Sequence, residues 1–263
     1  MIKRELNLFF NALLFYTRIR VPQSVVCNEQ TLSAAFRYLP LVGLLVAGIG
    51  AGAYALLAHV LPREVCVMAC MVLSILLTGA FHEDGLADFF DGFGAGYDKE
   101  SILRIMKDSH IGTYGVIALI LGLGLKYQLL ISLPEAWVVP ALITAGAVSR
   151  FFPVLSVRLF RYARVENSKA AHSALGVSKT TLFIAALLSL PLCFYFGWLV
   201  AVLIIVLELM CCLLLNAYTR RWIGGYTGDC LGAMQQFLEL LFYLILLSLP
   251  ALSQLHDTLS STH

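Results

Sequence analysis

Long apolar segments separated by short polar ones make up almost the whole of this chain. A helix needs about 20 apolar residues to cross the hydrocarbon core of a bilayer. Seven segments reach or approach that length, at residues 38–61, 65–81, 111–133, 136–155, 181–196, 199–215 and 231–252. The pattern predicts an all-α integral membrane protein, a polytopic bundle of about seven transmembrane helices.

The two ends of the chain differ from these segments. The apolar run at residues 6–15 is too short to cross a bilayer, and Arg18 and Arg20 follow it, so we predict an amino-terminal interfacial helix. Residues 1–252 are expected to form a single transmembrane catalytic domain. Residues 253–263 are polar, and we expect a disordered tail there.

Composition supports a membrane protein independently of the pattern. Apolar residues make up 60% of the chain and charged residues 13%, whereas soluble domains contain roughly half and a quarter. The lipid bilayer is therefore an expected partner. The net charge of +2 gives no reason to expect nucleic acid binding.

The basic residues test the predicted topology. With seven spans, fifteen of the eighteen Lys and Arg residues fall on one side of the membrane, which the positive-inside rule makes cytoplasmic. Arg63 falls on the other side, and Lys126 and Arg150 lie within spans. The fifteen are Lys3, Arg4, Arg18, Arg20, Arg37, Lys99, Arg104, Lys107, Arg158, Arg161, Arg164, Lys169, Lys179, Arg220 and Arg221.

Glycines mark one face of the first span. Gly43, Gly48, Gly50 and Gly52 allow another helix to approach closely. The approaching helix can belong to the same chain or to a second copy, so the sequence permits a homo-oligomer.

Residues 81–115 hold the most distinctive chemistry. This stretch lies between spans and carries seven of the sixteen acidic residues. Asp84, Asp88 and Asp91 stand at i, i+4 and i+7, which places them on one face of a helix. Like charges so placed repel one another, and a divalent cation removes the repulsion. Hard oxygen ligands of this kind suit Mg²⁺ or Mn²⁺.

Glycines and basic residues surround these acids. Glycine permits close approach of the backbone to a ligand, and carboxylates with nearby Arg or Lys suit a metal-bound diphosphate. Charges in a loop that simply face water are the ordinary alternative, which we favour for Asp98, Lys99 and Glu100. Arg104 and Lys107 can neutralise phosphate charge or extend to lipid headgroups.

Two acids near the last span need separate weighing. Asp229 follows the glycine-rich sequence GGYTGD at residues 224–229; it can be the N-cap of the last span, but we favour a metal ligand. Glu239 lies within that span, where an ionisable group is a functional candidate; it can equally pair with Lys126 or Arg150. Glu208 is expected to be a structural hydrogen-bonding partner.

Several motifs together resemble the cobalamin synthase family, over residues from about 9 to about 245. The matching segments are Phe81-His82-Glu83-Asp84-Gly85-Leu86-Ala87-Asp88, Asp91-Gly92, Met106-Lys107-Asp108-Ser109, Gly112, Gly224-Gly225-Tyr226-Thr227-Gly228-Asp229, Leu231-Gly232-Ala233, Glu239, Thr17-Arg18-Ile19-Arg20-Val21-Pro22 and Pro40-Leu41-Val42-Gly43. Glu83 departs from the family, where we expect an apolar residue. It is either an extra acid near the metal or an incidental exposed one.

The resemblance implies an adenosylcobinamide-GDP ribazoletransferase, a Mg²⁺-dependent enzyme of the bacterial cytoplasmic (inner) membrane with its active site facing the cytoplasm. Such an enzyme joins adenosylcobinamide-GDP to α-ribazole, or to α-ribazole 5′-phosphate, and releases GMP. On this chain the implied metal ligands are Asp84, Asp88, Asp91 and Asp229.

The resemblance also suggests roles for further residues. Asp91 is the first choice for the general base, with Asp108 and His82 as rivals, and Lys107 and Arg104 would neutralise phosphate charge. Residues expected to contact the substrate are Gly85, Gly92, Gly225, Thr227, Gly228 and Glu239.

Two other functions are weighed against this one. A CDP-alcohol phosphotransferase shares the metal and the reaction class, but its D-G-x-x-A-R signature is absent from residues 84–88. A cation or solute transporter would place its acids near the bilayer midplane, often in repeated halves. The acids of this chain instead cluster at the predicted cytoplasmic end of a span.

Overall fold

The computed structural model describes residues 2–164 and 176–260, with side chains described as far as Ser248. Within those residues the secondary structure is helical, and one isolated β-bridge joins Tyr162 to Tyr226. The helices are α1 (Ile2–Tyr16), α2 (Glu29–Ala35), η1 (Phe36–Tyr38), α3 (Leu39–Leu57), α4 (Arg63–Thr78), α5 (Phe81–Ala95), α6 (Lys99–Ile105), α7 (Thr113–Ser132), α8 (Glu135–Val148), α9 (Phe151–Leu159), α10 (Lys179–Ser189), η3 (Leu190–Phe196), α11 (Trp198–Ile223) and α12 (Gly228–Ser260).

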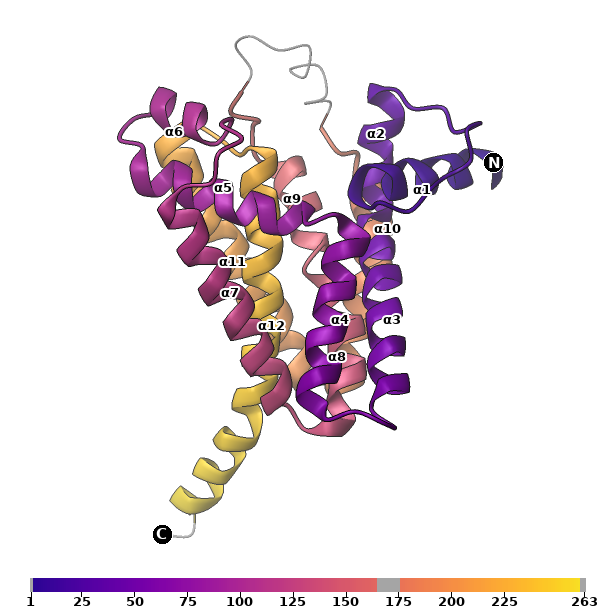
Figure 1. Ribbon diagram of the computed structural model, residues 1–263, viewed down its shortest axis with the longest axis vertical. Coiled ribbons are helices and arrows are strands. Elements are labelled where there is room, and N and C mark those ends of the chain that lie inside the picture. Colours follow the sequence, from indigo (N-terminus) through magenta and orange to yellow (C-terminus); the bar gives the residue numbers. More distant parts are fainter. Residues whose placement is uncertain (1, 165–175, 261–263) are drawn as a thin grey trace.

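Long apolar helices run side by side as a bundle (Figure 1). Six helical segments in the described part of the chain are long and apolar enough to cross a membrane, and the number rises to seven if the bent pair of α4 and α5 is counted as one span. The six are Glu29–Leu57, Thr113–Ser132, Glu135–Leu159, Lys179–Phe196, Trp198–Ile223 and Gly228–Ser248. The prediction of an all-α, multi-pass membrane protein is confirmed.

α5 does not continue the direction of α4. The two helices are bent by 86° at Gly79 and Ala80, which both have left-handed backbone angles (φ of 67° and 60°). α5 consequently lies across one end of the bundle, the end that also carries α1, α2 and α6 (Figure 1). The acidic stretch therefore sits at the end of the bundle, outside the spans, and α1 occupies the place expected of an interfacial helix.

Glycines bring particular helices into close contact. A Cβ atom at Gly43 of α3 would lie 2.0 Å from the carbonyl oxygen of Gly146 in α8, and one at Gly85 of α5 would lie 3.2 Å from the Cα of Gly232 in α12. Gly48 and Gly52 have open space beside them. The predicted glycine face of the first span thus serves an internal contact at Gly43 and remains accessible at Gly48 and Gly52.

Two boundaries differ from those that hydropathy predicts. The fourth predicted span is divided into α8 and α9, with the break at Ser149 and Arg150. The last helix does not end at residue 252 but continues to Ser260, whereas a disordered tail is expected from residue 253. Lys169, counted with the basic loop, lies outside the described residues.

Candidate functional site

The acids of α5 and α12 meet where these two helices cross. A Cβ atom at Gly85 would lie 3.1 Å from the carbonyl oxygen of Asp229, so the first turn of α12 contacts α5 between Asp84 and Asp88. Asp84 is exposed, and Asp88 and Asp229 are partly buried. Burial, followed by repulsion from the carboxylates of Asp229, Asp84 and Asp91, raises the pKa of Asp88 to about 7. Acids from two distant segments therefore share one electrostatic environment.

Arg164 is the charged partner of this cluster. Its Nη2 donates to Oδ2 of Asp229 at 2.8 Å, and its Nε is buried without a hydrogen-bond partner among the described residues. Thr227 donates its hydroxyl to the same Asp229 oxygen at 3.1 Å. Sequence reasoning placed Arg164 in the basic loop but did not identify it as a site residue.

Asp91 lies on α5 but its carboxylate points away from this cluster. Oδ2 accepts a hydrogen bond from the backbone N–H of Gly112 at 2.7 Å, and Oδ1 accepts one from Gly115 at 2.8 Å. These donors belong to the amino-terminal end of α7, whose first N–H groups have no partner within the helix. Asp91 therefore holds α7 against α5, and both of its oxygens are already occupied.

The GGYTGD loop is paired with the segment that carries Arg164. Tyr226 N–H donates to the Arg161 carbonyl at 3.0 Å, and Ala163 N–H donates to the Tyr226 carbonyl at 2.8 Å. A Cβ atom at Gly225 would lie 2.1 Å from the carbonyl oxygen of Arg161, so glycine is needed for this approach. The loop pairing fixes Arg164 beside Asp229.

Several residues expected to contact substrate have other contacts here. Gly85 permits the crossing of α5 and α12, Gly92 faces Met106, and Gly225 faces Arg161, whereas Gly228 has open space beside it. Thr227 is fully buried, and its Oγ1 accepts a hydrogen bond from the Cys230 N–H at 3.3 Å. Substrate contact by any of these five residues stays a prediction, and helix or loop packing explains three of the glycines.

The other catalytic candidates lie at different depths. Asp108, Lys107 and Arg104 are exposed; hydrogen bonds from the His110 ring and backbone lower the pKa of Asp108. His82 is buried, and burial lowers its pKa well below the usual value, which keeps the imidazole neutral. Asp108, Lys107 and Arg104 are thus accessible to solvent, whereas His82 is buried.

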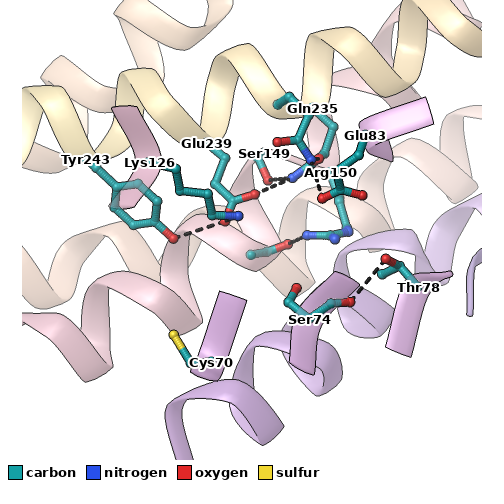
Figure 2. A network of polar contacts seen from close by, with 12 residues as sticks. Cys70, Ser74, Thr78, Glu83, Lys126, Ser149, Arg150, Gln235, Glu239 and Tyr243 are labelled. Carbon is teal, nitrogen blue, oxygen red and sulfur yellow. Dashed lines mark hydrogen bonds and ion pairs between the residues drawn. The ribbon is translucent and has the colours of Figure 1, made fainter. Parts of the chain in front are cut away.

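Glu239 belongs to a polar network inside the bundle (Figure 2). Its Oε1 lies 2.8 Å from Nζ of Lys126 and accepts a hydrogen bond from the Tyr243 hydroxyl at 3.0 Å. Its Oε2 accepts one from Gln235 at 2.7 Å, and Gln235 also donates to Ser149. The alternative that Glu239 pairs with Lys126 is confirmed, and contact of Glu239 with substrate stays a prediction.

Two further glutamates correct the sequence-based expectations. Glu83 is buried, its Oε1 accepts a hydrogen bond from Gln236 at 3.1 Å, and its Oε2 has no hydrogen-bond partner among the described residues, so it is not an exposed acid. Glu208 is fully buried, and neither of its carboxylate oxygens has a hydrogen-bond partner among the described residues. The expected role of Glu208 as a hydrogen-bonding partner is therefore wrong.

The cluster around Asp229 offers carboxylate oxygens, which are ligands that a divalent cation such as Mg²⁺ prefers. No group of three or more His, Cys, Asp or Glu side chains in the described part of the chain is arranged to hold a metal ion. Mg²⁺ is usually held by one or two carboxylates, with water and substrate phosphates supplying the remaining oxygens. The crowded carboxylates of α5 and α12 meet that smaller requirement.

Comparison with known proteins places the chain in a family. Residues 8–247 match the profile described as cobalamin-5-phosphate synthase. A protein of Vibrio cholerae named adenosylcobinamide-GDP ribazoletransferase is 41% identical over 249 residues, covering 94% of this chain and 95% of the relative. A protein of the same name from Shewanella amazonensis is 42% identical over 252 residues, covering 94% and 97%. No solved structure matches. The chain belongs to the cobalamin-5-phosphate synthase family.

Proposed function

We propose that this protein is a membrane-bound adenosylcobinamide-GDP ribazoletransferase. It joins adenosylcobinamide-GDP to α-ribazole, or to its 5′-phosphate, and releases GMP in the late part of cobalamin biosynthesis. Family membership and the names of the relatives support the activity. The observation that carries the location of the active site is the meeting of Asp84, Asp88 and Asp229 with Arg164 at one end of the bundle.

In this proposal Asp84 and Asp229 hold the Mg²⁺ ion. Their carboxylate oxygens are of the hard type that Mg²⁺ prefers. When bound, Mg²⁺ supplies charge neutralisation at the diphosphate and makes GMP a better leaving group. Asp91 is left out of the set because both of its oxygens bind the amino-terminal end of α7.

Asp88 takes the role of proton acceptor in place of Asp91. A general base works best when its pKa lies near the working pH, and the pKa of Asp88 is raised to about 7, first by burial. The ribazole hydroxyl oxygen attacks the phosphorus that carries the cobinamide, its proton passes to Asp88, and the bond to GMP breaks.

Arg164 binds the phosphate charge. Its Nη2 is held by Asp229, and its buried Nε has no partner among the described residues, so a donor is left for a phosphate oxygen. A guanidinium suits this role because its donors match phosphate geometry. Lys107 and Arg104 are exposed at the same end and remain secondary candidates.

The proposed setting is the bacterial inner membrane with the site facing the cytoplasm. Fifteen of the eighteen basic residues lie on the predicted inner side, as the positive-inside rule expects. α5 lies at the end of the bundle that bears the basic amino-terminal segment and α6 (Figure 1).

The activity is tested with the purified full-length protein in liposomes containing adenosylcobinamide-GDP, α-ribazole and Mg²⁺. GMP and the cobalamin product are followed by chromatography. We expect both in equal amounts, and loss of both when EDTA is added. If no product forms at any Mg²⁺ concentration tried, the proposed activity is wrong.

The residue roles are tested by comparing three asparagine variants. Asp84→Asn is expected to weaken Mn²⁺ binding, measured by electron paramagnetic resonance, together with turnover. Asp88→Asn is expected to lower kcat at least a hundredfold while keeping Mn²⁺ binding. Asp98→Asn is the matched control, because Asp98 is an exposed N-cap of α6 and Asn caps equally well. GMP release that persists in Asp84→Ala contradicts the metal assignment.

A further inference from the structure

A cavity of about 250 Å³ lies beside the proposed active site. It is enclosed by α1, α2, α5, α9 and the first turns of α12, and its wall includes Gly228 and His82. Gly228 precedes Asp229, and His82 lies two residues before Asp84. The cavity therefore opens next to the crossing of α5 and α12 that carries the acids.

Aromatic side chains form much of the cavity wall. Tyr16 and Phe81 meet edge to face with ring centroids 5.5 Å apart, and Tyr162 and Tyr226 do so at 5.6 Å. Edge-to-face pairs of this kind present ring surfaces against which another flat ring can pack. The aromatic residues of the wall are Phe15, Tyr16, Phe36, Phe81, Tyr162 and Tyr226.

One polar group in the wall lacks a partner. Asn11 is fully buried in α1, and its Nδ2 donates to the carbonyl oxygens of Asn7 and Val26 at 2.7 and 2.9 Å. Its Oδ1 has no hydrogen-bond partner among the described residues. A buried acceptor left in this state costs free energy, and it makes the α1 side of the wall less apolar than the rest.

The size and chemistry of the cavity restrict its occupant. Pockets for whole drug-sized ligands measure roughly 300–1,000 Å³, so 250 Å³ suits one ring system with an adjoining sugar edge. Two flat bicyclic bases occur in the proposed reaction, the guanine of the donor and the base of the acceptor nucleoside. Guanine has several polar groups along its edges, and the mainly apolar wall, where Gln235 and Arg150 are among the few polar side chains, would leave some of them without partners, which is unfavourable.

We propose that this cavity binds the aromatic base of the acceptor nucleoside. The base packs between the rings of α1, α5 and the GGYTGD loop, and this places the ribose at the α5–α12 crossing. This inference rests on the proposed function and specifies which part of the protein recognises the acceptor.

The test fills the cavity without touching the acids. Val157 lines the cavity from α9, and Val157→Phe adds a ring to the space. The matched control is Val202→Phe on α11, where the valine is 48% exposed and lines no part of the cavity. We expect the KM for α-ribazole to rise at least tenfold in Val157→Phe, with the KM for adenosylcobinamide-GDP and kcat at saturation unchanged, and no change in Val202→Phe.

Equilibrium dialysis with the purified protein in detergent gives a second readout. α-Ribazole binding is expected to weaken in Val157→Phe, whereas GMP binding is not. If GMP binding or the KM for adenosylcobinamide-GDP changes instead, the cavity holds guanine and the inference is wrong. If neither ligand responds and a lipid co-purifies in the wild-type cavity, an acyl chain is the occupant and the inference is again wrong.

Folding and the proposed function are controlled separately. Ala35→Leu fills the cavity from α2 and replaces Val157→Phe if that variant unfolds at a lower temperature than Val202→Phe. Wild-type turnover decides whether the protein is the proposed transferase. The difference between the two substrates in a filled variant then decides whether this cavity holds the acceptor base.

Discussion

Within the buried ion pair of Lys126 and Glu239, removing the carboxylate should destabilise the protein more than removing the ammonium group. Lys126 and Glu239 lie 2.8 Å apart, with side chains 8% and 9% exposed, on the two helices α7 and α12. The pair is part of the network that joins α7, α12 and the break between α8 and α9 (Figure 2). We consider Glu239→Gln, Lys126→Met and the double variant.

The expected magnitudes follow from what each change leaves behind. Removing one partner of a buried pair costs about 3–5 kcal/mol because a charge is left uncompensated. Glu239→Gln should reach this range, since the cations of Lys126 and Arg150 lose the carboxylate that they share. Lys126→Met should cost less, about 1–3 kcal/mol, because Glu239 keeps hydrogen bonds from Gln235 and Tyr243.

The double variant provides the decisive measurement. It removes both charges, so its cost should be smaller than the sum of the single costs, with a coupling of about 2–4 kcal/mol. Unfolding in mixed micelles, titrated with a denaturing detergent and followed by circular dichroism, measures all three. Glu100→Gln, an exposed acid in α6, is the control and should change the free energy of unfolding by less than about 0.5 kcal/mol.

Two outcomes would refute this reasoning. Additive costs in the double variant would mean that the two side chains are not coupled, in contradiction to their contact. A larger cost for Lys126→Met than for Glu239→Gln would mean that the hydrogen bonds from α12 do not hold the carboxylate. Either result would mean that this polar network does not hold α12 in position.

Three further predictions concern the active-site end of the bundle. Gly115→Ala should destabilise the protein by about 1–3 kcal/mol in the same unfolding assay, because its Cβ would lie 2.4 Å from Oδ2 of Asp91; an unchanged midpoint would contradict the contact. Gly225→Ala should lower kcat/KM at least tenfold at nearly unchanged α-helix content, because its Cβ would collide with the Arg161 carbonyl and disturb the loop pairing. Asp108→Asn should keep kcat within about twofold of wild type, since this exposed side chain contacts His110 and lies outside the proposed site; a large loss would restore it as the base.

Hydropathy and charge were sufficient to predict the overall architecture, because both depend on the composition of whole segments and not on individual contacts. The all-α bundle and the interfacial α1 both follow from the lengths of the apolar segments and the polar residues between them. The break at Ser149 and Arg150 was not predictable from hydropathy, since the polar residues involved are bonded within the protein interior rather than to lipid or water. Arg150, for example, donates to the Gly146 carbonyl at 2.7 Å.

The acidic face was predictable in part. The spacing of Asp84, Asp88 and Asp91 correctly indicated one helix, α5. Spacing does not show which neighbour each carboxylate meets, and α7 supplies backbone donors to Asp91. Arg164 was missed for a related reason, because its position depends on a bridge between residues 162 and 226 that are far apart in the sequence. Its membership of a basic loop on the same side as the acids was the available signal.

The position of the site depends on two backbone features acting together. The bend at Gly79 and Ala80 turns α5 across the end of the bundle, which removes its carboxylates from the apolar interior where they would be costly. The absence of side chains at Gly85 and Gly232 then lets α5 and α12 approach until their backbones touch. Asp229 is brought next to Asp84 and Asp88 by this approach and not by any attraction between the acids, which repel one another. The packing of the helices therefore imposes a repulsion between these acids, which the proposed cation would relieve.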